Sequence, residues 1–265
     1  KEIREGLPRR YFRALPLLVD PPLAGLPRVY GIAWAFVAHT DGAFDEELLA
    51  AFLIAYQQQR ELNLSEMWAL PTTLRVVLIE NLRRLAERVA ANKAARELAN
   101  LCCDRIDEYP VEALDRLLLV LQQRGVARVF LAQMVQRLQD RHAGDDGAEP
   151  DGHHAWLRRV LPDRAVVQAQ QSADQAADNL SVSNAITSLR TIGDADWPDL
   201  VARTSTLMRL MLTAPAFEAE HVATRDRTLH GIERLARRSG RSELAVGQAL
   251  LEQVRGAVDA RSAVT

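Results

Sequence analysis

The stretch from Ser65 to Ala90 places the strongest constraint on how this chain can fold. Apolar side chains recur in it every three or four residues, which puts them on one face of an α-helix. Charged side chains fall mostly on the opposite side, where water can solvate them. The spacing predicts a long packing helix. Its apolar face is formed by Leu74, Val77, Leu78, Leu82, Leu85 and Val89, and its charged side by Arg75, Arg83, Arg84, Glu87 and Arg88.

Pro71 interrupts this pattern. Proline has no backbone N–H to donate, so a break or kink in the helix is expected there. We therefore predict a short turn from Ser65 to Leu70, followed by a long helix that starts near Thr72, with Thr72 as its N-cap. The apolar pattern allows this helix to continue to Cys102.

Helical spacing recurs along the rest of the chain, and strand alternation flanked by hairpin turns is absent. The sequence predicts an all-α fold, a multi-helix bundle or irregular helical array of about nine to eleven helices. Besides the central helix, the expected helices are 28–39, 45–59, 110–125, 126–141, 155–161, 164–179, a short helix capped by Ser181 or Ser183, 196–212, 224–239 and 242–258.

Two stretches punctuate this pattern and suggest the domain organisation. Residues 7–27 contain five prolines and predict an extended leader. Residues 144–152 combine glycine, proline and acidic side chains, which is typical of a linker. We predict an N-terminal helical subdomain at 1–143 and a C-terminal helical subdomain at 153–265, and 265 residues suffice for both.

Charge, hydropathy and cysteine content exclude several classes. A net charge of −2 argues against a nucleic-acid surface. No apolar run approaches ~20 residues, so no transmembrane segment is expected. Cys102 and Cys103 are adjacent, and two thiols cannot complete a structural zinc site, so we expect reduced thiols and a cytoplasmic setting. The chain starts with Lys1 and shows no signal peptide, which predicts a piece of a longer protein.

Sequence motifs of common catalytic sites are absent: there is no HExxH, glycine-rich phosphate loop, GxSxG or CxxC. His153 and His154 adjoin the linker without further metal ligands in view, which favours surface histidines. His39 beside Asp41 could form an acid–base pair, but a helix C-terminus also favours histidine. We interpret both sets as structural.

Glu80 and Asn81 interrupt the apolar face of the central helix. Arg83 and Arg84 follow within one turn, so salt bridges are the favoured interpretation. A catalytic carboxylate is the alternative, but no partner carboxylate is visible. We predict no catalytic, cofactor-binding or metal-binding residue in this chain, and no cofactor.

The segment Ile232–Val254 offers an alternative function, because helix, turn and capped helix resemble a DNA-binding helix-turn-helix. Its basic residues are Arg234, Arg237, Arg238 and Arg241. However, Gly240 is also an ordinary C-cap, and basic residues are favoured at a helix end. The second helix brings only Arg255, far from its first turn. Nucleic-acid binding remains the weaker interpretation.

Three stretches carry a resemblance to a known family. They are LPRRYFRALPLLVDPPLAGLPRVYGIAWAFVAHTDGAFD, SEMWALPTTLRVVLIENLRRLAER and ATRDRTLHGIERLARRSGRSE. In this order they resemble the N-terminal region of the cyclic β-1,2-glucan synthases (NdvB-type proteins). The similarity covers most of the chain and is weakest from about Gly144 to Ala177.

The resemblance implies a non-catalytic helical scaffold or docking module of a membrane-bound synthase that builds glucan from UDP-glucose. It places the module on the cytoplasmic side of the bacterial inner membrane, with the rest of the parent protein as partner. The family's glycosyltransferase motifs have no counterparts here, so no enzyme activity is expected. A glycan-binding module is the alternative, although aromatic residues form only 5% of the chain.

Four tryptophans suggest how such a module would dock. Trp34, Trp68, Trp156 and Trp197 are more large rings than a detached spacer needs. Some of them could anchor an interface with the parent protein, where an aromatic ring in a pocket can dominate binding. The alternative is that all four belong to the core.

Overall fold

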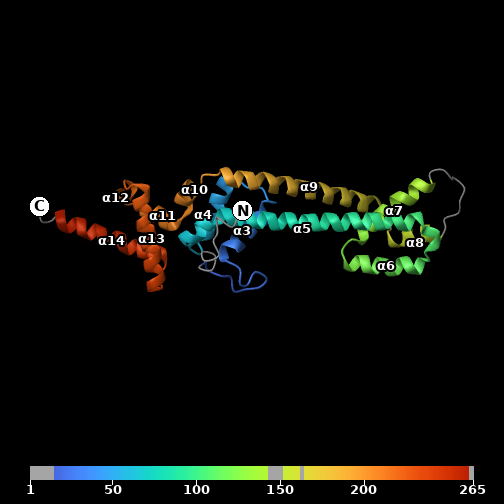
Figure 1. Ribbon diagram of the computed structural model, residues 1–265, viewed down its shortest axis with the longest axis horizontal. Coiled ribbons are helices and arrows are strands. Elements are labelled where there is room, and N and C mark those ends of the chain that lie inside the picture. The colour runs from blue at the N-terminus through green and yellow to red at the C-terminus, as the bar shows by residue number, and fades with distance from the viewer. Residues whose placement is uncertain (1–14, 143–151, 162–163, 263–265) are drawn as a thin grey trace. The chain divides into compact units, whose positions relative to one another are not determined.

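The computed structural model describes residues 15–142, 152–161 and 164–262. Within these ranges the regular structure is helical (Figure 1). An isolated antiparallel bridge joins Leu17 to Pro27. The all-α prediction is confirmed. The elements are α3 Arg28–His39, α4 Glu46–Gln57, α5 Leu64–Asp104, η1 Ile106–Glu108, α6 Val111–Gln123, α7 Ala127–His142, α8 Gly152–Val160, α9 Arg164–Asp194, α10 Trp197–Thr204, α11 Thr206–Met211, α12 Pro215–Glu218, α13 Val222–Ser239 and α14 Glu243–Ser262.

Several helices begin close to the start of their expected ranges, and side chains cap them there. The Asp45 carboxylate accepts from the Leu48 N–H at 2.8 Å and caps α4. Asp196 caps α10 in the same way, ahead of Pro198 in the first turn. The Ser242 hydroxyl accepts from the Ala245 N–H at 3.2 Å at the start of α14. Each cap satisfies a backbone donor that the first helical turn leaves without a partner.

The expected break at Pro71 is wrong, because α5 runs without interruption from Leu64 to Asp104 and Thr72 is a buried residue within it. The Glu66 carboxylate accepts from the Asn63 N–H at 3.0 Å. The Glu243 carboxylate accepts from the Leu64 N–H at 2.8 Å. These bonds fix the first turn of α5 ahead of the proline, so the helix does not have to begin at Thr72.

A buried ion pair reinforces this first turn. Arg28, at the start of α3, donates from Nε to Glu66 Oε1 at 2.9 Å and from Nη2 to Glu66 Oε2 and the Glu61 carbonyl. The two side chains are 9% and 0% exposed. Burial on its own lowers the pKa of Arg28, but the hydrogen bond and charge of Glu66 outweigh it, so the pKa is raised. The pair therefore joins α3 to α5 in the core.

A second expected boundary, near Ser181 or Ser183, is also wrong, because α9 continues from Arg164 to Asp194. The reason lies in the loop before α4. Ser188 on α9 donates to the Gly42 carbonyl and accepts from the Phe44 N–H, both at 2.7 Å. These long-range contacts hold the second half of α9 in helical register. Conversely, the single helix expected to reach Leu212 is divided at Ser205, which caps α11.

Compact units of this fold do not follow chain order. The first unit combines residues 1–79 with 184–265, and the second contains residues 80–183. The boundary therefore falls within α5 and within α9. Of the proposed linker 144–152, all but Gly152 lies outside the described residues, so the division into 1–143 and 153–265 stays a prediction.

The described part of the first unit packs α3, α4 and the start of α5, and α10 to α14 complete it. Its fully buried side chains include Leu49, Leu53, Met67, Leu74 and Leu78. Gly42 adopts φ +75°, a left-handed conformation that glycine tolerates best, and a Cβ there would meet Leu78 at 3.6 Å. The tight loop thus rests directly on the apolar face of α5.

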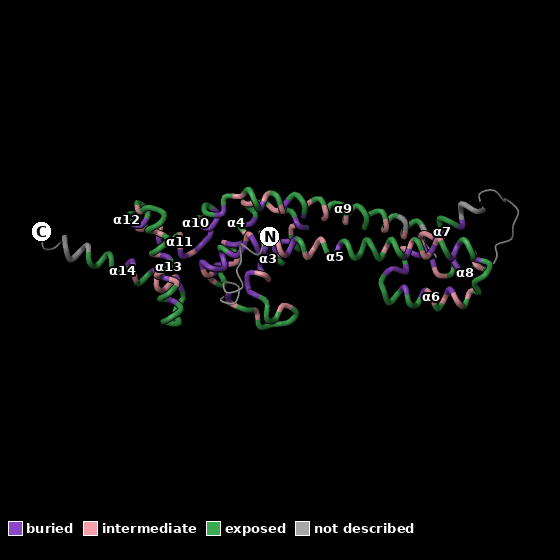
Figure 2. Tube along the Cα trace, viewed as in Figure 1, coloured by how far each residue is buried: buried purple, intermediate pink, exposed green. Residues whose placement is uncertain are grey.

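In the second unit, α6, α7 and α8 pack around the C-terminal part of α5. The core includes Phe130, Met134 and Trp156, and also the adjacent thiols of Cys102 and Cys103. Figure 2 shows buried residues in these helices, whereas the first half of α9 is largely exposed. The second unit therefore contains a long helical surface that the rest of the unit does not cover.

Candidate functional site

The four tryptophans divide into two buried and two exposed rings. Trp156 and Trp197 are buried, and their indole N–H groups donate to Asp115 Oδ1 at 2.7 Å and to the Ile192 carbonyl at 2.9 Å. Trp34 on α3 and Trp68 on α5 are 43% and 44% exposed. Both exposed rings belong to the first unit. They are candidate contact points for a partner.

The Glu80 carboxylate lies in a cluster of ion pairs at the surface. It accepts from Arg83 Nε and Nη2 at 2.8 Å and from Arg84 Nε at 3.0 Å, and Arg83 also pairs with Glu87. Hydrogen bonds from Arg83 and Arg84 lower the pKa of Glu80 to about 2. A carboxylate held ionised in this way is a poor general acid near neutral pH. This geometry matches the salt-bridge interpretation.

Histidines and cysteines named from the sequence are not brought together. His153 Nε2 lies 2.8 Å from the Tyr109 carbonyl, whereas the side chain of His154 is outside the described set. Cys102 and Cys103 are buried thiols, and burial raises the pKa of Cys102. Across the described ranges, no three His, Cys, Asp or Glu side chains lie close enough to hold a metal ion.

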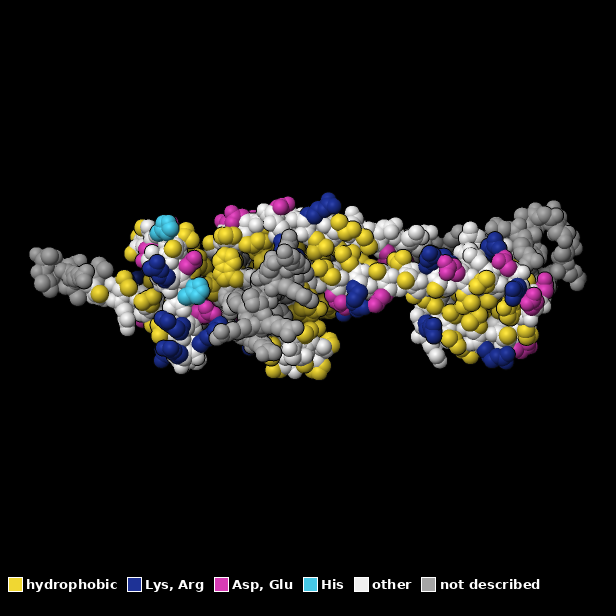
Figure 3. Space-filling view, in the orientation of Figure 1, with side chains coloured by type: hydrophobic (Ala, Val, Ile, Leu, Met, Phe, Trp, Pro, Cys, Tyr) yellow, Lys and Arg dark blue, Asp and Glu magenta, His cyan; other side chains and the backbone are white. Residues whose placement is uncertain are grey.

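The helix–turn–helix segment is formed by α13, a left-handed Gly240 at φ +68° and α14. Basic side chains gather over α13 (Figure 3), and Arg237 pairs with Glu233. A recognition helix contacts base edges with its N-terminal residues. Here the first turn of α14 contains Glu243, which is buried and bonded to the Leu64 N–H. The first turn of α14 is therefore engaged in contacts within the chain.

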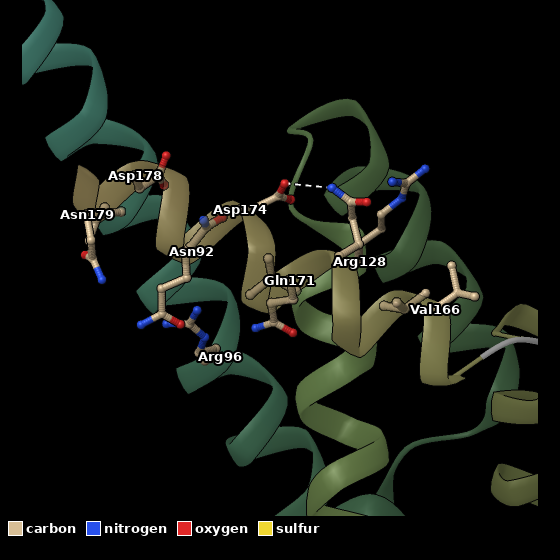
Figure 4. A pocket seen from close by; sticks show the side chains of 13 residues that line it. Asn92, Arg96, Arg128, Val166, Gln171, Asp174, Asp178 and Asn179 are labelled. Atoms are coloured by element: carbon tan, nitrogen blue, oxygen red, sulfur yellow. Dashed lines mark hydrogen bonds between the residues drawn. The ribbon is translucent and has the colours of Figure 1, made fainter. Parts of the chain in front are cut away.

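A groove that the sequence did not indicate lies within the second unit, between α5, α7 and the first half of α9. Its volume is about 360 Å³, and Figure 4 shows side chains from all three helices around it. Most of its polar groups are amides, carboxylates and guanidinium groups. The lining residues are Val89, Asn92 and Arg96 of α5, Arg128 and Val129 of α7, and Val166, Val167, Gln170, Gln171, Asp174, Gln175, Asp178 and Asn179 of α9.

Val89 was predicted to continue the buried face of α5, and that expectation is wrong. Leu74, Val77, Leu78 and Leu85 of the predicted face are buried and Leu82 is half-buried, but Val89 is 50% exposed and lines the groove. Nearby, Gln170 donates to Asp174 at 2.9 Å, and Arg88 pairs with Asp178. In the sequence, the first half of α9 is Gln/Ala-rich and lacks the apolar face expected of a core helix, which indicates an exposed helix but not a groove.

These features define an all-α module with two exposed tryptophans and an open, polar groove in its second unit. None of the helices in the described ranges has an apolar stretch that could cross a bilayer. No protein-family model matches the chain.

Over 260 residues the chain is 34% identical to the cyclic β-(1,2)-glucan synthase NdvB of Rhizobium meliloti (strain 1021). The alignment covers 96% of this chain and 9% of that protein, so the chain spans about a tenth of its relative's length. The resemblance noted in the sequence is confirmed: the chain is homologous to a segment of a cyclic β-1,2-glucan synthase.

Proposed function

We propose that this chain is a non-catalytic docking module of a membrane-bound cyclic β-1,2-glucan synthase that builds glucan from UDP-glucose. In this proposal it lies on the cytoplasmic side of the inner membrane and contacts the remainder of the parent protein. The observation that carries the proposal is the exposure of two large aromatic rings, Trp34 on α3 and Trp68 on α5, at 43% and 44%.

Covering the exposed parts of the two rings would contribute substantial binding free energy. A tryptophan buries up to about 250 Å², so each exposed part corresponds to roughly 100 Å² of surface. At about 25 cal/mol per Å² of apolar area, covering one ring contributes roughly 2–3 kcal/mol. Aromatic anchors of this size dominate protein interfaces. Two of them supply a docking surface for the rest of the synthase.

Electrostatics of the α5 surface support the non-catalytic part of the proposal. Glu80, the best carboxylate candidate from the sequence, is hydrogen-bonded to two arginines and has a pKa of about 2. Its environment is that of a surface ion-pair network, which orders neighbouring side chains on a helix. A proton-transfer role would require a pKa closer to the working pH.

The test is a glucan-synthesis assay on a full-length synthase containing this segment. We expect the double variant Trp34→Ala/Trp68→Ala to lower glucan output and to release the segment from the rest of the protein in limited proteolysis. The matched control is Leu48→Ala/Leu235→Ala, which also removes exposed apolar side chains, at 51% and 55%. Normal glucan output and unchanged proteolysis in the tryptophan variant would refute the docking role.

A further inference from the structure

We propose that the groove between α5, α7 and α9 binds a neutral, hydroxyl-rich ligand, namely a segment of glucan chain. This inference rests on the proposed function for the identity of the sugar. The groove itself is independent of the exposed tryptophans, because its lining residues all belong to the second unit.

Polar groups are arranged along the groove at regular intervals. On α9, Gln171, Gln175 and Asn179 follow one another every four residues, and Asn92 and Arg96 have the same spacing on α5. Four residues of α-helix correspond to about 6 Å of rise. Each helix therefore presents a row of hydrogen-bonding groups along the groove. A chain of sugar units, with hydroxyls along its length, can bond to such a row at several points.

Several of these groups have hydrogen-bonding capacity to spare. Asn92, Arg96 and Gln171 are half-buried, and none of them has a hydrogen bond or ion pair to another described residue. Figure 4 shows Asn92 and Arg96 on α5 and Gln171 on α9, the two helices that both line the groove. An amide both donates and accepts, which suits the donor and acceptor character of a hydroxyl.

The charge of the lining favours a neutral ligand. The lining contains two arginines, Arg96 and Arg128, and two aspartates, Asp174 and Asp178, so its formal charges cancel; Asp178 also pairs with Arg88. A phosphate or nucleotide site would have an excess of basic groups or a helix N-terminus aimed at the anion.

The apolar part of the lining consists of valines. Val89 and Val166 are 50% and 60% exposed, and no Leu, Met, Phe or Trp lines the groove. A docked helix from another protein would need larger pockets for its apolar anchors. Small valine surfaces can instead contact the C–H groups of a sugar ring. Since no aromatic ring is available for stacking, hydrogen bonds carry the recognition.

The experiment is isothermal titration of the 265-residue chain with linear β-1,2-linked gluco-oligosaccharides. We expect saturable binding that weakens at least tenfold in the double variant Asn92→Ala/Gln171→Ala. The matched control, Gln58→Ala/Gln59→Ala, removes two exposed amides of the first unit and should bind as the unaltered chain does. Far-UV circular dichroism establishes that each variant is folded.

Two results would overturn the inference: no saturable binding of the oligosaccharide, or equal binding by the groove variant and its control. Binding of UDP or inorganic phosphate that Asn92→Ala/Gln171→Ala abolishes would also overturn it, because the groove would then be an anion site. The Trp34→Ala/Trp68→Ala variant should bind the oligosaccharide normally. Failure of the groove is thereby distinguished from failure of the docking proposal.

Discussion

Replacing Glu66 with alanine should destabilise the first unit more than any change to a surface ion pair. The substitution removes the acceptor for Arg28 Nε and for the Asn63 N–H, and leaves Arg28 Nη2 with only the Glu61 carbonyl. The Arg28 side chain is 9% exposed in the folded chain, so its guanidinium cannot regain full hydration without a rearrangement.

The size of the effect follows from this burial. Removing one partner of a buried ion pair costs about 3–5 kcal/mol, because an uncompensated charge is left in a poorly solvated place. Replacing both partners with apolar side chains removes that charge, so Arg28→Met/Glu66→Met should lose less stability than Glu66→Ala alone. The pair itself is thus less important than the penalty for breaking half of it.

These differences in the free energy of unfolding can be measured by urea unfolding followed by far-UV circular dichroism. Where the dependence of the free energy on urea concentration keeps the same slope, a shift in the urea midpoint reports the change in stability. The control is Glu233→Ala, which breaks the Arg237–Glu233 pair, whose side chains are 58% and 22% exposed. That change should cost less than about 1 kcal/mol. Equal midpoints for Glu66→Ala and Glu233→Ala, or a double variant less stable than Glu66→Ala, would refute the argument.

Three further predictions concern packing, pH and catalysis. Leu78→Ala should lower the free energy of unfolding by about 2–5 kcal/mol, because Leu78 is 1% exposed. Leu82 is only half-buried, so Leu82→Ala should lower it by less. Equal losses in urea unfolding would contradict the burial pattern. Burial raises the pKa of Glu243 above its ordinary 4.5, so the folded chain holds this proton more tightly than the unfolded chain. Its stabilising contribution is therefore complete below pH 4.5 and is lost as pH rises through the raised pKa of the folded chain, so the unaltered chain should lose stability relative to Glu243→Gln as pH rises above 4.5. Urea midpoints that differ equally at every pH would disprove this. The purified chain should not hydrolyse UDP-glucose, and turnover that disappears in Glu80→Gln would restore a catalytic role for that carboxylate.

Local chemistry was sufficient to predict most helices. The apolar spacing of Arg28–His39 gave the observed bounds of α3, and α4 and α10 begin directly after Asp45 and Asp196, where their helices were expected to start. The errors occurred where contacts between residues far apart in the sequence determine where a helix begins or ends. The residues around Pro71 do not indicate that Glu243 accepts a hydrogen bond from the first turn of α5. The residues around Ser181 do not indicate that Ser188 bonds to the loop at Gly42.

Site prediction was limited in the same way. The salt bridges of Glu80 were predictable because Arg83 and Arg84 lie within one turn of the same helix. The groove was not predictable, because it requires α5, α7 and α9 to come together. Exposure of Trp34 and Trp68 rather than Trp156 and Trp197 could not be read from the sequence, since burial depends on tertiary packing.

The most direct test of the docking account is the affinity of the 265-residue chain for the rest of the synthase, prepared without this segment. We predict saturable binding by surface plasmon resonance that weakens at least tenfold in Trp34→Ala/Trp68→Ala and is unchanged in Leu48→Ala/Leu235→Ala. Absence of binding, or equal affinities for the tryptophan variant and its control, would contradict the account.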